Sequence, residues 1–223
     1  RLAVVGTKDA VPALAALLPD EKLNVYARTA LENIPGPESA TALREAAKTL
    51  KGHTLVGAID SIGQLRDAEA LELLEAYLDD KDLSVASAAA GAIGRIGTPL
   101  AADVLSYKIA DGSPIKIALG EAALTCADRL DAAGETALAA DLCHWLLHKR
   151  PRLGESTLTP GETDLPAHLK DAALLGILRR QLLSVNDLLV SLILSPDESF
   201  FEVGLAAARE KPGEDVTGTL AGN

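Results

Sequence analysis

The sequence predicts an all-α protein, built as a right-handed α-α superhelix, a solenoid of stacked helical hairpins. Hydrophobic residues make up 48% of the chain but aromatic residues only 3%, so the core consists mainly of small and aliphatic side chains that suit closely packed helices. No stretch keeps the period-two alternation that marks a half-buried strand. A pattern of two short helices recurs at intervals of roughly 30 residues, as in helical-hairpin repeat proteins.

The clearest copy of this pattern spans residues 67–97. Each half carries one apolar stripe at helical spacing. Asp82 separates the halves as a helix N-cap, because its carboxylate can accept hydrogen bonds from the free amides of the next turn. Gly97 and Pro99 then form a stop signal. In this copy we expect the following side chains to be buried: Leu71, Leu74, Leu78, Val85, Ala89, Ile93 and Ile96.

Weaker copies of the pattern lie on both sides of this one. We expect the copies to stack, because one hairpin cannot bury both of its faces alone. The expected helices span residues 9–18, 23–34, 37–50, 53–64, 99–110, 113–130, 134–149, 165–181, 185–194 and 198–210. With the central copy they make one array of about six helix pairs over residues 1–223. Aligning the second helices by their terminal glycines matches Gly36, Gly63 and Gly97. Residues 1–5 resemble the tail of a truncated helix, so we expect the chain to be a fragment of a longer one.

The segment 85–99, VASAAAGAIGRIGTP, resembles the second helix and exit turn of a HEAT repeat. It is similar in particular to the short bacterial HEAT-like type found in phycobilisome-lyase-like and other armadillo-like proteins. The resemblance covers about residues 6–130. It implies a helical solenoid with a concave groove lined by the second helices, and it implies no particular reaction.

The charge balance argues against two classes of partner. The chain has 21 basic and 32 acidic residues, a formal net charge of -11. Nucleic-acid sites need a basic footprint, and anionic membrane surfaces attract basic segments, so we expect neither partner. No apolar run is long enough to span a bilayer. Two cysteines are too few for a disulfide scaffold and leave the compartment open: cytoplasmic by default, exported or periplasmic as the alternative.

No residue cluster has the pattern of a catalytic or metal site, so we expect no cofactor. His144 and His148 are one helical turn apart, a spacing that metal sites use, but Trp145 stands where a zincin motif needs glutamate. Surface histidines near a helix end are the favoured interpretation. Cys126 and Cys143 stand in apolar sequence, and we expect two free, buried thiols.

A loop at residues 150–164 interrupts the fifth helix pair and is longer than most connections. The only concentration of basic residues surrounds it: Arg150, Arg152, Arg179 and Arg180. One hypothesis is that the loop borders a partner site, with Arg150 and Arg152 contacting an acidic or carboxylate-bearing group. The alternatives are a mobile surface tether and a solvated rim that pairs with Glu155 and Glu162.

The function that the sequence favours is a non-catalytic protein–protein interaction scaffold. Its partner is a protein or peptide, with other domains of the same parent chain as a further candidate. The expected contact residues lie on the second helices, opposite the apolar stripes, and beside the loop: Asn24, Arg28, Glu32, Ser84, Ser87, Gly91, Arg95, Arg150, Arg152 and Arg179. A cofactor- or tetrapyrrole-handling protein, as in the bilin-lyase-like relatives, is the alternative. A helical-repeat nucleic-acid enzyme of the DNA-glycosylase kind is the third reading, and the acidic charge disfavours it.

Overall fold

The computed structural model describes residues 6–110, 113–147 and 164–180. Every regular element in these ranges is a helix and none is a strand, which confirms the all-α prediction. The elements are η1 (Lys8–Ala10), α2 (Val11–Ala15), α3 (Asn24–Asn33), α4 (Pro37–Ala47), α5 (Gly52–Leu65), η2 (Ala68–Ala70), α6 (Leu71–Tyr77), α7 (Leu83–Ile96), α8 (Pro99–Ala110), α9 (Lys116–Ala132), α10 (Thr136–Leu147) and α11 (Ala167–Arg180).

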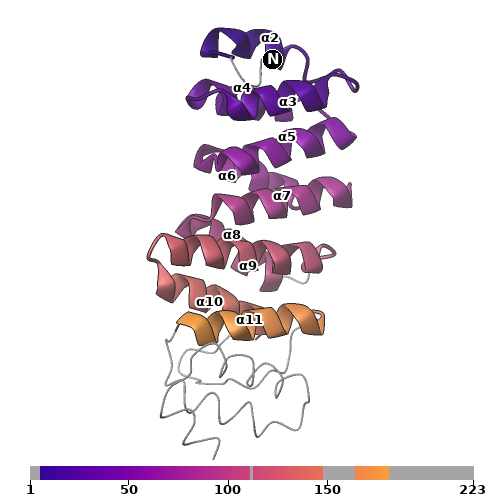
Figure 1. Cartoon of the computed structure of the whole chain (residues 1–223). Helices are drawn as coiled ribbons and strands as arrows, with labels where there is room; N and C mark the ends of the chain where they lie inside the picture. The colour runs from indigo at the N-terminus through magenta and orange to yellow at the C-terminus, as the bar shows by residue number, and fades with distance from the viewer. Residues whose placement is uncertain (1–5, 111–112, 148–163, 181–223) are drawn as a thin grey trace, which may run out of the picture.

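Consecutive helices pack in pairs, and the pairs stack into a solenoid. The contacts join α2 to α3, α4 to α5, α6 to α7, α8 to α9 and α10 to α11. Each second helix also packs on the next, from α3 through α5, α7 and α9 to α11. Figure 1 shows the resulting column, in which the five described pairs follow one another from α2 to α11.

The ends of α5 and α7 show which residues of the two repeats are equivalent. The Asp82 carboxylate accepts the backbone N–H two residues later at 2.9 Å, so the predicted N-cap is confirmed. Gly97 ends α7 with φ 64°, and Arg66 ends α5 in the same left-handed conformation with φ 52°. The expectation that Gly63 ends its helix is therefore wrong, because an arginine takes the left-handed position. Gly63 lies inside α5, where Gly94 lies in α7.

The core follows the predicted stripes. All seven side chains expected to be buried in residues 67–97 are buried, with none more than 6% exposed. Between second helices the packing is closer still. A Cβ atom on Gly63 would lie 2.8 Å from the Ala92 Cα, and one on Gly94 would lie 2.5 Å from the Ala122 carbonyl oxygen. The second helices therefore meet through their backbones at these two glycines.

Polar contacts join successive first helices on the other side of the array. The Tyr77 hydroxyl of α6 donates to the Ala47 carbonyl oxygen at the end of α4, at 2.8 Å. Burial raises the pKa of Tyr77, so the hydroxyl keeps its proton for this bond. Lys108 of α8 pairs with Asp79, in the turn after α6, at 2.6 Å. These contacts tie α6 and α8 each to the repeat before it.

Several sequence-based expectations fall at the edges of the described structure. The helix expected over residues 9–18 is instead the 3-10 turn η1 followed by the short helix α2. The fifth pair is present as α10 and α11. The sixth pair, residues 1–5 and all of the 150–164 loop except residue 164 lie outside the described residues. No helix in the described ranges is long and apolar enough to cross a membrane.

Candidate partner-binding face

The second helices α3, α5, α7, α9 and α11 present one continuous side of the array, which we call the second-helix face. Ser87 and Gly91 are partly exposed on α7, where the sequence predicts contact residues. The predicted arginines are mostly buried in this face: the Arg95 side chain is 27% exposed and the Arg28 side chain 18%. Most of each guanidinium side chain is thus engaged within the array.

Arg28 links α3 to α5. Its Nη1 donates to the Gly57 carbonyl oxygen at 2.9 Å and to the Ser61 hydroxyl at 3.0 Å. The Ser61 hydroxyl in turn donates to the carboxylate of Glu32, and the Arg28 Nε donates to the Asn24 side-chain oxygen at 2.8 Å. Charged hydrogen bonds of this kind are stronger than neutral ones. Arg28 and Glu32 therefore fix the spacing of two repeats, whatever else they contact.

Asn24 is not a surface residue, contrary to its expected place on this face. It is 3% exposed, and its side-chain amide donates to the Leu18 carbonyl oxygen after α2. A buried asparagine needs such partners, and the backbone before α3 supplies one. Ser84, by contrast, is exposed at the start of α7, where its hydroxyl donates to Asp82.

Arg95 repeats the link between second helices one step along the array. Its Nη2 donates to Asp60 of α5 at 2.9 Å, and both side chains remain partly exposed. Gly91, one turn before Arg95, keeps the surface above the guanidinium open, since even a Cβ atom there would lie 3.7 Å from the Arg95 Nη1. An exposed pair of this type contributes about 0–1 kcal/mol, so its main effect is to hold Arg95 in place.

The predicted basic cluster divides between surface and interior. Arg179 is exposed, whereas its neighbour Arg180 is only 9% exposed, so the solvated-rim alternative is wrong for Arg180. Arg150 and Arg152 lie outside the described residues, as does His148. Successive helical residues point about 100° apart, which is why adjacent arginines reach different environments.

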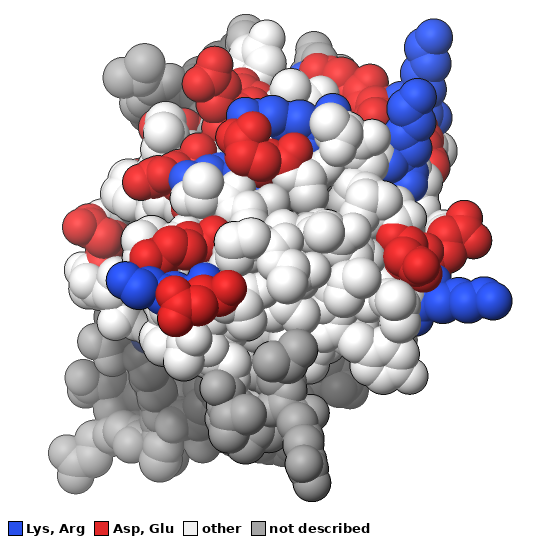
Figure 2. Space-filling view, turned by 90° about the horizontal axis from the view of Figure 1, so that it is seen from above, with Lys and Arg blue, Asp and Glu red and all other residues white. Residues whose placement is uncertain are grey.

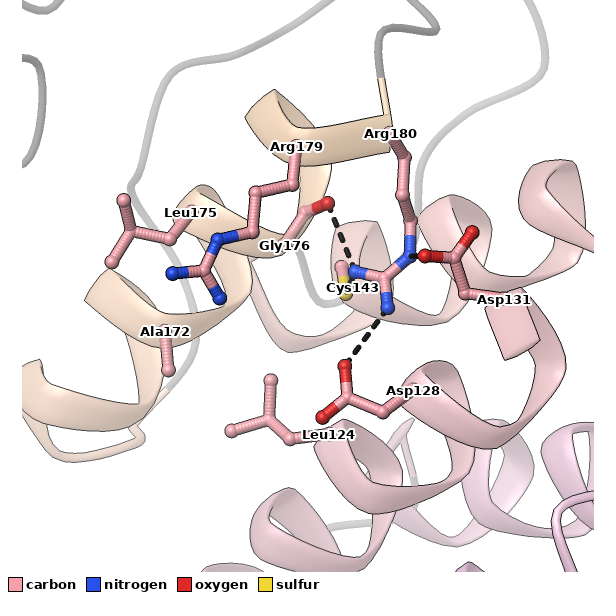
Figure 3. A pocket seen from close by; sticks show the side chains of 9 residues that line it. All are labelled: Leu124, Asp128, Asp131, Cys143, Ala172, Leu175, Gly176, Arg179 and Arg180. Atoms are coloured by element: carbon pink, nitrogen blue, oxygen red, sulfur yellow. Dashed lines mark hydrogen bonds and ion pairs between the residues drawn. The ribbon is translucent and has the colours of Figure 1, made fainter. Parts of the chain in front are cut away.

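A pocket of about 300 Å³ opens between α9, α10 and α11 beside these two arginines. Figure 3 shows Arg180 reaching toward two carboxylates of α9, while the Arg179 guanidinium points to another side of the pocket. The Arg180 Nη2 donates to Asp128 at 3.0 Å, its Nε lies 3.7 Å from an oxygen of Asp131, and its Nη1 donates to the Gly176 carbonyl oxygen at 2.9 Å. No pattern in the sequence predicts this site.

The two cysteines are free and buried, as expected. Burial raises the pKa of the Cys126 thiol to about 12 and that of the Cys143 thiol to about 11. The Arg180 guanidinium, 3.7 Å from the Cys143 Sγ, opposes part of that rise. Neither thiol is a ready nucleophile, because the thiolate is the reactive form. Within the described ranges no three His, Cys, Asp or Glu side chains come together as a metal site.

The comparisons with known proteins bear on the central repeats. Residues 53–125 match the family model of HEAT repeats. The match runs from α5 into α9, across the helices that pack through Gly63 and Gly94, and it supports a HEAT-repeat protein. The bacterial and phycobilisome-lyase-like assignments stay predictions. No protein in the curated set matches the chain.

Proposed function

We propose that this HEAT-like array is a non-catalytic scaffold that binds a protein or peptide along its second-helix face. The observation that carries the proposal is the contact between successive second helices, which makes five helices into one uninterrupted surface. Extended surfaces of this kind suit the binding of extended partners. The proposed contact residues are Arg28, Glu32, Ser87, Gly91, Arg95 and Arg179, together with Arg150 and Arg152 of the 150–164 loop.

The chemistry of the face favours binding over catalysis. The buried Cys126 thiol of α9 holds its proton, and Arg28 and Arg95 are engaged in links between repeats. Catalytic groups need reactive protonation states within reach of a substrate. Links such as Arg28 to α5 instead give a rigid surface, which lowers the entropic cost of binding a partner.

A photo-crosslinker tests the face directly. We would place a benzophenone amino acid at Ser87, on the second-helix face, and at Ala76, which is exposed on the first helix α6. If the proposal is right, the crosslinker at position 87 forms covalent adducts with a partner protein or peptide, and the crosslinker at position 76 forms none. Adducts of equal yield from both positions, or from position 76 alone, would overturn it.

A different surface, at the first helix pair, supports a second candidate partner, which is another part of the parent chain. Leu17, Leu23, Val25 and Tyr26 of the first pair are exposed, between 37% and 74%. Figure 2 views the array from this end, where uncharged residues occupy the centre and charged side chains gather toward the edges. An apolar end of this kind fits the stacking of a further helix pair. A longer chain that adds residues before Arg1 should then protect the Tyr26 ring from solvent quenching.

A further inference from the structure

The pocket between α9, α10 and α11 opens on the second-helix face, because all of its lining residues except Cys143 belong to α9 and α11. Its volume of about 300 Å³ is at the lower end of the range for small-molecule sites. It therefore suits one side chain or one small molecule. Leu124, Ala172 and Leu175 supply apolar walls, two aspartates and two arginines supply charges, and Cys143 and Gly176 complete the lining.

One edge of the pocket is acidic. Asp128 is 83% exposed even though one of its oxygens accepts a hydrogen bond from Arg180. Asp131 is 41% exposed, and it also accepts the Thr136 hydroxyl at 3.0 Å. Arg180 carries one positive charge between two carboxylates, so this edge keeps a net negative charge. The buried guanidinium holds Asp128 by a hydrogen bond, and the Thr136 hydroxyl holds Asp131.

Another edge of the pocket carries Arg179, and its guanidinium points away from Asp128 in Figure 3. A guanidinium has five N–H donors in a fixed fork, so Arg179 can bind a carboxylate in addition to the interaction it already makes. With two aspartates and two arginines, the described lining is neutral overall but has separated charges. A ligand with one charge of each sign matches this arrangement.

We propose that the pocket binds a zwitterion with an aliphatic body, supplied by the carboxyl-terminal lysine of a partner peptide. The lysine ammonium lies against Asp128, the terminal carboxylate against Arg179, and the methylene chain on Leu124 and Leu175. Lysine combines an apolar stem with a charged head, as the lining does. The inference rests on the proposed function, since it names the chemistry of the peptide that the second-helix face takes.

Titration with matched small molecules tests the pocket without a known partner. The probes are 6-aminohexanoate, which has both charges, pentylamine, which has only the cation, and hexanoate, which has only the anion. Amide chemical shifts of the whole protein report binding. We expect 6-aminohexanoate to bind at least about tenfold more tightly than either half, with the largest shifts near Leu124 and Leu175. Equal affinities for all three probes, or shifts elsewhere, would overturn the proposal.

Variants separate the two edges. Asp128→Asn should reduce the affinity for 6-aminohexanoate to that for hexanoate, and Arg179→Gln should reduce it to that for pentylamine. Glu121→Gln is the matched control, because Glu121 is exposed on the same helix and does not line the pocket. The same loss in the control would point to net charge and overturn the assignment. The comparison of probes on the unaltered chain stays decisive if a variant does not fold.

A titration with peptides tests whether a peptide carboxyl terminus supplies the zwitterion. An acetylated Ala-Ala-Lys peptide with a free carboxylate should bind at least about tenfold more tightly than its amide. Binding of 6-aminohexanoate with no preference between acid and amide would overturn the peptide assignment. These titrations use no partner protein, so they succeed or fail independently of the crosslinks at Ser87 and Ala76.

Discussion

Gly94 of α7 lies against the backbone of Ala122 in α9, closely enough that a single added methyl group would meet the Ala122 carbonyl oxygen at 2.5 Å. Gly94→Ala should therefore destabilise the array. Overpacking in a close-packed interior costs about 1–3 kcal/mol, which exceeds the roughly 0.5–1 kcal/mol that alanine contributes over glycine in a helix. Urea denaturation followed by circular dichroism measures the change.

The matched control for that substitution is Gly91→Ala, one turn earlier in the same helix. Its added methyl group would meet nothing closer than the Arg95 Nη1 at 3.7 Å. We expect this variant to be unchanged or slightly more stable. If both alanines had the same effect, the close approach of α7 to α9 would not be the cause.

Ala89→Leu tests the core of α7 in a second way. Ala89 has no exposed surface and belongs to the stripe that packs α7 into the array. The larger side chain should lower the free energy of unfolding by about 1–3 kcal/mol. Ala76→Leu, at an exposed position of α6, is the control and should stay within about 0.5 kcal/mol of the parent chain.

Asn24→Ala should destabilise the first helix pair. It leaves the buried Leu18 carbonyl oxygen without its donor and the Arg28 Nε without its acceptor. An unsatisfied buried polar group costs about 1–3 kcal/mol. Asn33→Ala removes an exposed side chain that bonds only within its own helix, so it should change stability much less. Thermal melts of both variants would show no difference if Asn24 were solvated.

The buried thiols predict a loss of stability at alkaline pH. In an unfolded chain a thiol loses its proton near its ordinary pKa of 9.0, whereas Cys126 and Cys143 keep theirs to about 12 and about 11. Between pH 9 and 11 the folded state thus binds more protons than the unfolded state, so the free energy of unfolding falls as pH rises. Well below pH 9 both states keep these protons, and the thiols then contribute no pH dependence.

Urea denaturation at pH 8 and pH 10 measures this effect against a variant with Cys126→Ala and Cys143→Ala. The stability of the parent chain should fall more between the two pH values than that of the variant. Both thiols should also resist labelling until urea is added. Parallel pH profiles, or fast labelling of the folded chain, would show that the thiols are accessible.

The sequence predicts the repeat because helical periodicity and capping are local properties. The stripe from Leu71 to Ile96 and the cap at Asp82 depend only on residues a few positions apart, and the structure confirms both. The register between repeats is harder to predict, since Arg66 takes a left-handed position that usually selects glycine. The Ile-Gly pair that recurs at Gly63 and Gly94 is the signal that gives the correct spacing of 31 residues.

The pocket could not be predicted in the same way. Arg180 and Asp128 are 52 residues apart, and only the packing of α11 on α9 brings them together. Neighbouring arginines in the sequence suggest one basic cluster, but the helix turns Arg180 inward and leaves Arg179 outside. The prediction for Asn24 is wrong for a related reason. The side chain of a polar residue at a helix start can hydrogen-bond to the preceding turn instead of facing the solvent.

The two glycine contacts make residues 67–97 an interchangeable module. On one side of α7, Ala92 packs against Gly63 of α5. On the other side, Gly94 packs against Ala122 of α9, so α7 carries both halves of the same type of contact. A duplicate inserted after Gly97 would set its own Ala92 equivalent against Gly94 and present a new glycine to Ala122. The number of repeats can therefore change at this point by whole units while this glycine contact is kept.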